Sequence, residues 1–184
     1  MELVLVLGSA IVVFGVASVL SPELAKAQYM WGLWLVPVIV IGVHPRFIKA
    51  LLARLKREPG AFRLAYADTL KILGLYTLCW CIYGLGFYLI GTSLELGDAT
   101  PPFRSAGLEL YPDMAGINAL SWAGGLLSVV TPAGLGVREG ISGLLLAEVV
   151  EKPYPALIPL VARLWVTIAE LGTLGLVFLL RGWK

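Results

Sequence analysis

Charged residues are missing from long stretches of this chain, and this pattern restricts its fold more than any other feature. Four stretches contain no Asp, Glu, Lys or Arg: Leu3 to Leu20, Tyr29 to Val43, Ile72 to Leu94 and Leu171 to Leu180. About 20 apolar residues in a helix cross the hydrocarbon core of a bilayer. The stretches are of that length or approach it, so the pattern predicts several membrane helices.

The composition agrees with a chain that lies in lipid. The residues are 59% hydrophobic and 14% charged, whereas a soluble domain is about half apolar and about a quarter charged. A water-facing surface cannot be built from so few charges. We therefore expect an all-α fold, a polytopic integral membrane helical bundle that forms one transmembrane domain over residues 1–184. The net charge of +2 is too small to indicate nucleic acid as a partner.

The expected membrane spans follow the apolar stretches. The first of them resembles the apolar part of a secretory signal, but it has no basic leader and no small-x-small cleavage site. We expect it to be retained as a span. The spans are predicted at about 3–20, 29–44, 70–93 and 155–180.

The segments between these spans differ in charge, which predicts their sides of the membrane. From His44 to Lys71 there are seven basic residues and two acids, and residues 46–57 have the spacing of an amphipathic helix. Loops rich in Lys and Arg stay in the cytoplasm. The loop from Glu95 to Asp113 has four acids and one basic residue, Arg104. We expect it outside, with both termini inside.

The segment 114–150 is an interrupted helix. An apolar helix at about 114–130 is followed by TPAGLGVREG at 131–140 and a second apolar run at 141–150. A run of ten helical residues covers about 15 Å, half of a bilayer. We interpret the segment as a re-entrant, broken-helix hairpin, which leaves the basic C-terminus in the cytoplasm. Two full spans are the alternative and would place the C-terminus outside.

Four charged residues lie in or beside these apolar segments: Arg138, Glu139, Arg163 and Glu170. A charge within a membrane costs a few kcal/mol unless a partner, a wet cavity or a ligand compensates it. In one interpretation Arg163 pairs with Glu139 and Glu170 pairs with Arg138. These pairs would fix the hairpin against the last helix without any ligand.

The other interpretation is an anion site at the turn. Gly134 and Gly136 leave backbone amides open just ahead of a helix, and the N-terminus of a helix favours anions. Arg138 lies beside them. Irregular backbone at membrane depth is tolerated only when it is buried or lines a wet cavity. A lipid phosphate is the ligand that such a turn would bind.

The sequence contains no pattern typical of an enzyme. It has no metal-ligand spacing, nucleophile motif or phosphate-binding loop. Cys79 and Cys81 are two residues apart and point to different faces of a helix, so we expect neither a metal site nor a disulfide. His44 is expected to form hydrogen bonds at the membrane interface. We expect no catalytic residue, no metal, no cofactor and no enzymatic activity.

The stretch from Ser121 to Arg163 resembles the transmembrane region of the lysylphosphatidylglycerol synthase and flippase family. The signature is a Pro-x-Gly-Leu-Gly-x-Arg-Glu turn followed by Arg-Leu in the next helix. Its positions here are Pro132, Gly134, Leu135, Gly136, Arg138, Glu139, Arg163 and Leu164. Members of the family are associated with moving or modifying anionic phospholipids or polyprenyl-linked lipids. The resemblance covers the C-terminal half of that region only.

The resemblance implies a flippase-like protein that handles anionic or polyprenyl-linked lipids in the bacterial cytoplasmic (inner) membrane. A second copy or a partner subunit would complete its cavity. The alternative is a non-catalytic accessory subunit that packs into a larger membrane complex. The residues expected to bind an anionic head group are Pro132, Gly134, Gly136, Arg138 and Arg163, and those expected to form structural ion pairs are Glu139 and Glu170.

Overall fold

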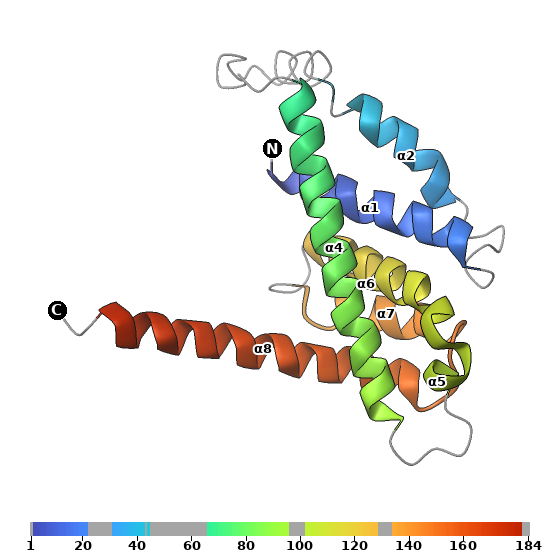
Figure 1. The fold of residues 1–184 in the computed structure, drawn as a ribbon, viewed down its shortest axis with the longest axis vertical. Coiled ribbons are helices and arrows are strands. Elements are labelled where there is room, and N and C mark those ends of the chain that lie inside the picture. The colour runs from blue at the N-terminus through green and yellow to red at the C-terminus, as the bar shows by residue number, and fades with distance from the viewer. Residues whose placement is uncertain are drawn as a thin grey trace.

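The structure of the chain is a computed structural model, and it describes residues 2–21, 31–42, 44, 66–95, 102–128 and 134–181. These residues contain helices and no strand, which confirms the expected all-α fold. The helices are α1 (Glu2–Leu20), α2 (Trp31–Gly42), α4 (Tyr66–Leu94), α5 (Pro102–Ala106), the 3-10 helix η2 (Gly107–Leu110), α6 (Tyr111–Leu127), α7 (Val137–Leu146) and α8 (Tyr154–Arg181) (Figure 1).

Two of the helices, α4 and α8, are long and apolar enough to cross a membrane. The apolar helix Val4–Leu20 is shorter. Helix α2 has 12 residues, so it reaches only about 18 Å.

Small side chains let α1, α4 and α6 pack closely against one another. A Cβ atom added to Gly84 of α4 would lie 2.5 Å from the Cα atom of Ala115 in α6. Ala10 of α1 and Ala119 of α6 are buried in the same cluster. Glycine and alanine let the backbones of helices approach. The indole Nε1 of Trp80 adds a hydrogen bond to the hydroxyl of Ser9, at 3.0 Å.

A second, aromatic-rich cluster joins α4 to the other helices near its C-terminal end. It takes in α5, α6, α7 and the first turns of α8. Its rings contact edge to face, as in the pair of Tyr88 and Phe103. The buried members are Phe87, Tyr88, Phe103, Met114, Ile117, Leu146, Val150, Tyr154 and Ile158.

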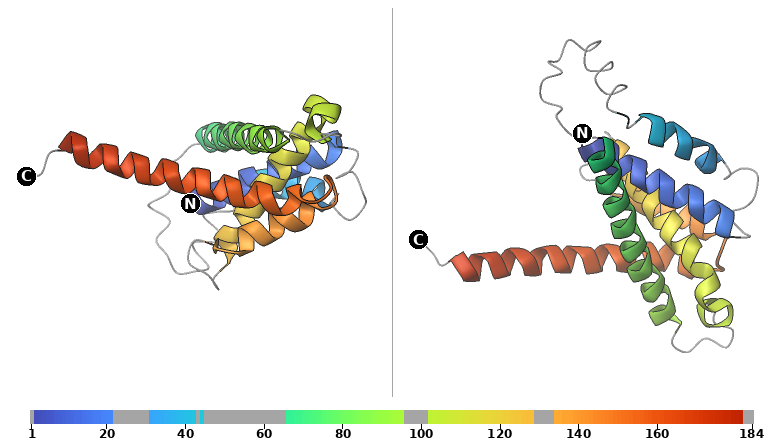
Figure 2. Two further views of the ribbon diagram at one scale, coloured as in Figure 1. Left: turned by 90° about the horizontal axis from the view of Figure 1, so that it is seen from below. Right: turned by 45° about the horizontal axis from the view of Figure 1, so that its top comes forward.

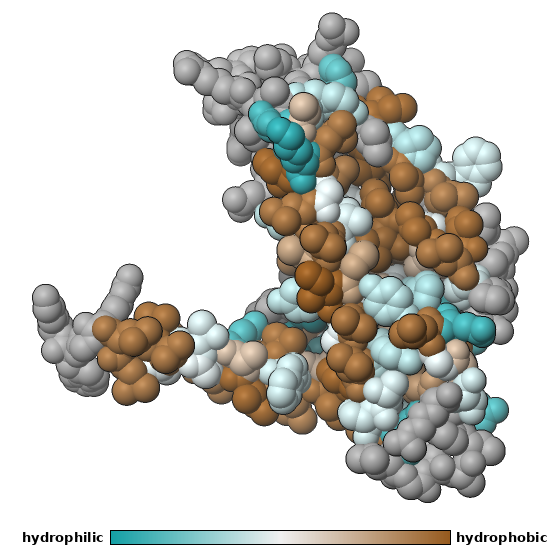
Figure 3. Space-filling view, in the orientation of Figure 1, coloured by the Kyte–Doolittle hydropathy of each residue, from teal (hydrophilic) through white to brown (hydrophobic). Residues whose placement is uncertain are grey.

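Helix α8 packs only at its beginning. Tyr154 and Ile158 are buried, but none of the most apolar window of the helix is buried. The helix leaves the other elements and runs crosswise to α4 in Figure 1 and in the right-hand view of Figure 2. Its surface is largely apolar (Figure 3). Beyond its first turns, the helix exposes a long apolar surface that no described part of the chain covers.

The acidic loop expected outside the membrane is partly helical, which the charge pattern did not predict. Helices α5 and η2 lie within it. Glu95 is buried and accepts a hydrogen bond from the backbone amide of Phe103, and the buried carboxylate of Asp113 accepts one from the hydroxyl of Ser21. Both acids hold helix ends in place, so they are not solvent-facing charges.

The hairpin elements also begin earlier than expected. Helix α6 starts at Tyr111, and α7 starts at Val137 and not at Ile141. Arg138 and Glu139 therefore lie in the first turn of α7. The carboxylate of Glu139 accepts a hydrogen bond from the backbone N–H of Gly136, the residue before the helix. The predicted amphipathic helix at 46–57 and the predicted site residue Pro132 lie outside the described residues.

Candidate functional site

Two glycines shape the entry into α7. Gly134 has a φ of 67° and Gly136 a φ of 82°, a backbone region that side chains with a Cβ rarely adopt. A Cβ atom at Gly134 would lie 2.6 Å from the Cα atom of Gly125 in α6, while one at Gly136 would have open space. The turn thus lies directly on the end of α6 at Gly134 and stands free at Gly136.

These two glycines provide a matched test of the turn. Gly134→Ala is expected to lower the free energy of unfolding by about 2 to 3 kcal/mol, because the left-handed backbone and the contact with α6 are both disturbed. Gly136→Ala adds only the backbone strain and is expected to cost about 1 kcal/mol. Thermal unfolding in detergent measures both. Equal losses would mean that the turn does not rest on Gly125.

Glu139 closes the N-terminal end of α7 and faces α8. One of its carboxylate oxygens, Oε2, accepts a hydrogen bond from the backbone N–H of Gly136 at 2.8 Å. The other, Oε1, lies 4.0 Å from Nε of Arg163. The structure thus brings together Arg163 and Glu139, one of the two pairs expected from the sequence. The Gly136 amide, expected to be open to an anion, is instead bonded to Glu139.

Arg138 points from α7 toward α6 and is held there by packing. Its guanidinium carbon lies 3.1 Å from the ring centroid of Trp122, a cation–π contact. Its alkyl chain lies against Gly125, where a Cβ would collide with it. Its Nε atom is buried and has no hydrogen-bond partner. The side chain is therefore fixed in place with one N–H left without an acceptor.

The second expected pair, Arg138 with Glu170, is not formed among the described residues. Glu170 is on the exposed part of α8, and it lines a cavity of about 170 Å³ together with Arg138, Arg163 and Trp122. The ring of Trp122 draws Arg138 toward α6, so the carboxylate stays beyond ion-pair distance. The prediction of this contact was wrong.

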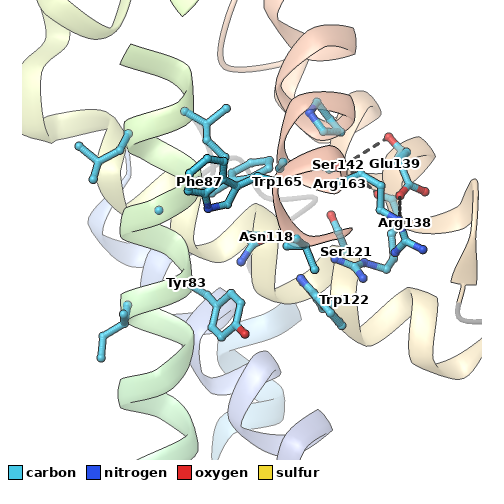
Figure 4. A pocket seen from close by; sticks show the side chains of 17 residues that line it. Tyr83, Phe87, Asn118, Ser121, Trp122, Arg138, Glu139, Ser142, Arg163 and Trp165 are labelled. Carbon is cyan, nitrogen blue, oxygen red and sulfur yellow. Dashed lines mark hydrogen bonds and ion pairs between the residues drawn. The ribbon is translucent and has the colours of Figure 1, made fainter. Parts of the chain in front are cut away.

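A larger cavity of about 480 Å³ lies among α4, α6, α7 and α8. In Figure 4 the charged residues of α7 gather on one side, and Tyr83 and Phe87 of α4 lie on the other. The lining residues with charge, neutral polar groups or rings are Arg138, Glu139, Arg163, Asn118, Ser121, Ser142, Tyr83, Phe87, Trp122 and Trp165. This cavity has a charged end, polar groups beside it and an apolar wall.

The sequence analysis missed the part of the cavity that α6 supplies. Asn118 and Ser121 are buried, and Nδ2 of Asn118 has no hydrogen-bond partner. Asn118, Ser121, Trp122 and Gly125 recur at the spacing of one helix face. That face carries two neutral polar residues of a largely apolar helix, and its periodicity is the signal that would have pointed to it.

Family models, curated proteins and solved structures were compared with this chain, and none of them matches it. Within the described residues, no group of three or more His, Cys, Asp or Glu side chains could hold a metal ion. The chemistry of the site therefore follows from the cavity and its own residues. The Nε of Arg138 and the Nδ2 of Asn118 are both donors without a hydrogen-bond partner, and both favour a ligand with oxygen atoms.

Proposed function

We propose that this chain is a flippase-like membrane protein whose cavity binds the anionic head group of a phospholipid or a polyprenyl-linked lipid. One observation carries the proposal: Arg138 lines the cavity, and its buried Nε has no hydrogen-bond partner. Leaving a buried donor unpaired costs about 1 to 3 kcal/mol, and more for a charged group. A lipid phosphate would supply the missing acceptor.

The charges that line the larger cavity favour an anion. They are Arg138 and Arg163 against Glu139, or two positive charges and one negative, which leaves a net charge of +1. Glu139 already accepts a hydrogen bond from the amide of Gly136 and lies near Arg163. Arg138 is therefore the cation that can still bind an anion. The N-terminus of α7 adds positive potential at the same end.

The apolar wall suits the chains of such a lipid. Ile82 and Leu89 of α4 and Val166 of α8 line the cavity. Ile82 and Leu89 are also exposed on the outside of α4, so the apolar surface continues outward from the cavity. A head group could then lie at the charged end while its chains remain in the surrounding membrane.

The proposal includes insertion as a polytopic bundle in the bacterial cytoplasmic membrane. The length and apolar surface of α4 and α8 support it. Because α8 runs crosswise to α4, both helices cross one bilayer only if α8 swings toward the direction of α4 (Figure 2). Pro159 lies inside α8, where the buried part of the helix ends, and proline removes a helical hydrogen bond there. This is the point at which we expect the helix to bend.

A second candidate function is that of an accessory subunit in a larger membrane complex. The uncovered apolar part of α8, from Leu164 to Leu180, favours it, because a neighbouring subunit could pack there. The mass of the particle and its lipid content after gentle solubilisation distinguish the two. A homodimer enriched in anionic lipid supports lipid handling. A stoichiometric complex with other proteins and without enriched lipid supports the accessory role.

Arg138→Gln tests the head-group site. The variant keeps a polar side chain but removes the charge, and we expect bound anionic lipid to fall about tenfold, because a charge-assisted hydrogen bond is worth about 1.5 to 3 kcal/mol. Lipid bound to the purified protein is measured by native mass spectrometry. Lys71→Gln is the control, since Lys71 is exposed and pairs with Asp68 within α4. Unchanged lipid in Arg138→Gln would refute the site.

A further inference from the structure

We propose that the lipid of this site carries a hydroxylated ring joined through its phosphate, and that Asn118, Ser121 and Ser142 bind the hydroxyl groups of that ring. The inference rests on the proposed function, because it assumes a lipid phosphate at Arg138. It goes further by naming a second recognition element in the same cavity. Phosphosugar lipids and phosphoinositol lipids share this chemistry.

The argument begins with three neutral polar residues that are more than nine-tenths buried. Asn118 is 8% exposed, Ser121 is 3% exposed and Ser142 is 4% exposed, yet all three line the cavity. Asn118 and Ser121 come from α6, and Ser142 comes from α7 (Figure 4). Two helices thus place neutral polar groups beside the charged end of one cavity.

The hydrogen bonds of these residues leave a defined set of free groups. The hydroxyl of Ser121 donates to the carbonyl oxygen of Ile117 at 2.6 Å, and that of Ser142 donates to the carbonyl oxygen of Arg138 at 2.8 Å. Each serine has used its proton, and its oxygen retains capacity as an acceptor. Asn118 instead has an unused donor, because its Nδ2 has no partner.

This set matches a hydroxyl better than a phosphate. A hydroxyl both donates and accepts, so it can donate to the serine oxygens and accept from Asn118. An ionised phosphate only accepts, and it has no proton for Ser121 or Ser142. The guanidinium of Arg138 therefore binds the charged phosphate oxygen, and the neutral polar groups beside it bind hydroxyls.

The aromatic residues of the cavity favour a ring over an open chain. Tyr83, Phe87, Trp122 and Trp165 all line it. Tyr83 is 56% exposed and Trp165 is 68% exposed, so their rings are accessible. The ring of Trp122 is already in contact with the guanidinium of Arg138. The faces of aromatic rings carry negative charge density and attract the weakly positive C–H groups of a saturated ring. A ring with hydroxyls at its edge and C–H groups on its faces fits both linings.

Lipid pairs with the same phosphodiester charge, one with the ring and one without it, test the inference. Wild-type protein in nanodiscs is titrated with phosphatidylinositol against phosphatidylmethanol, and with glucosyl-phosphopolyprenol against methyl-phosphopolyprenol. We expect the ring-bearing lipid of at least one pair to bind about tenfold more tightly than its partner. A tenfold difference corresponds to about 1.4 kcal/mol, which one or two hydrogen bonds can supply. The pair that shows the difference identifies the source of the ring.

Two variants remove the hydroxyl-binding groups and should abolish this preference. Asn118→Leu has nearly the shape of the native side chain and Ser142→Ala removes a single oxygen, and the quantity measured is the ratio of the two affinities within each lipid pair. Ser18→Ala is the matched control, since Ser18 is buried in α1 and donates to its own helix at 2.8 Å but does not line the cavity. It should keep the preference.

The outcomes separate this inference from the proposed function. If ring-bearing and ringless lipids bind equally while Arg138→Gln weakens both, the head-group site stands and the inference is overturned. A preference that survives in both Asn118→Leu and Ser142→Ala also overturns it. If none of the four lipids binds, the proposed function fails, and the inference fails with it.

Discussion

Gly84→Leu is expected to disrupt the packing of α4 on α6 and to give the largest loss of stability of any single change considered. A Cβ atom alone would lie 2.5 Å from both Cα and Cβ of Ala115, so a leucine forces the two helices apart. Overpacking of this kind costs about 3 kcal/mol or more. The midpoint of thermal unfolding in detergent should fall by about 6 to 12 °C.

Gly74→Leu is the matched control for this change. Gly74 lies on the same helix, and a Cβ atom there would have no neighbour within 4 Å. The substitution also replaces glycine by a better helix former, which favours the helical state slightly. We expect an unchanged or slightly raised midpoint. If both variants unfold at the same temperature, α4 and α6 do not pack at Gly84.

The apolar stretches were enough to predict where most helices lie. Each long stretch without charge lies largely or wholly within a helix. Helices α5 and η2 could not be predicted in this way. The acids near them are buried through distant partners, as Asp113 is by the hydroxyl of Ser21, and a count of charges along the chain treats such acids as solvent-facing.

The candidate site was predicted in part: the sequence indicated its charged residues but not its neutral polar ones, for a physical reason. Arg138, Glu139 and Arg163 stood out because charges in apolar segments are costly, and the structure places all three at one cavity. Asn118 and Ser142 did not stand out, since neutral polar residues in a helix often bond to its own backbone. Their importance depends on which helix faces meet at the cavity, and that is a property of the tertiary structure.

The choice of partner for Arg138 shows the same limit. Sequence spacing placed Arg138 within possible reach of Glu170, but it could not weigh a carboxylate on α8 against an aromatic ring on α6. In the structure the guanidinium lies on Trp122. A fixed ring on a packed helix holds the cation, whereas Glu170 is exposed on a helix with few neighbours.

Exchange of the two charges, Arg138→Glu with Glu170→Arg, is expected to remove bound anionic lipid while the protein still folds. The exchange keeps the net charge and moves the cation from the ring of Trp122 to the exposed part of α8. The lost cation–π contact is worth about 1 kcal/mol, so the thermal midpoint should fall by only about 2 to 4 °C. A carboxylate at position 138 would repel a phosphate, and lipid phosphorus per protein should drop to the level of Arg138→Gln. If the exchanged protein instead keeps its wild-type lipid, the cation at position 138 does not hold the head group and the proposed site is refuted.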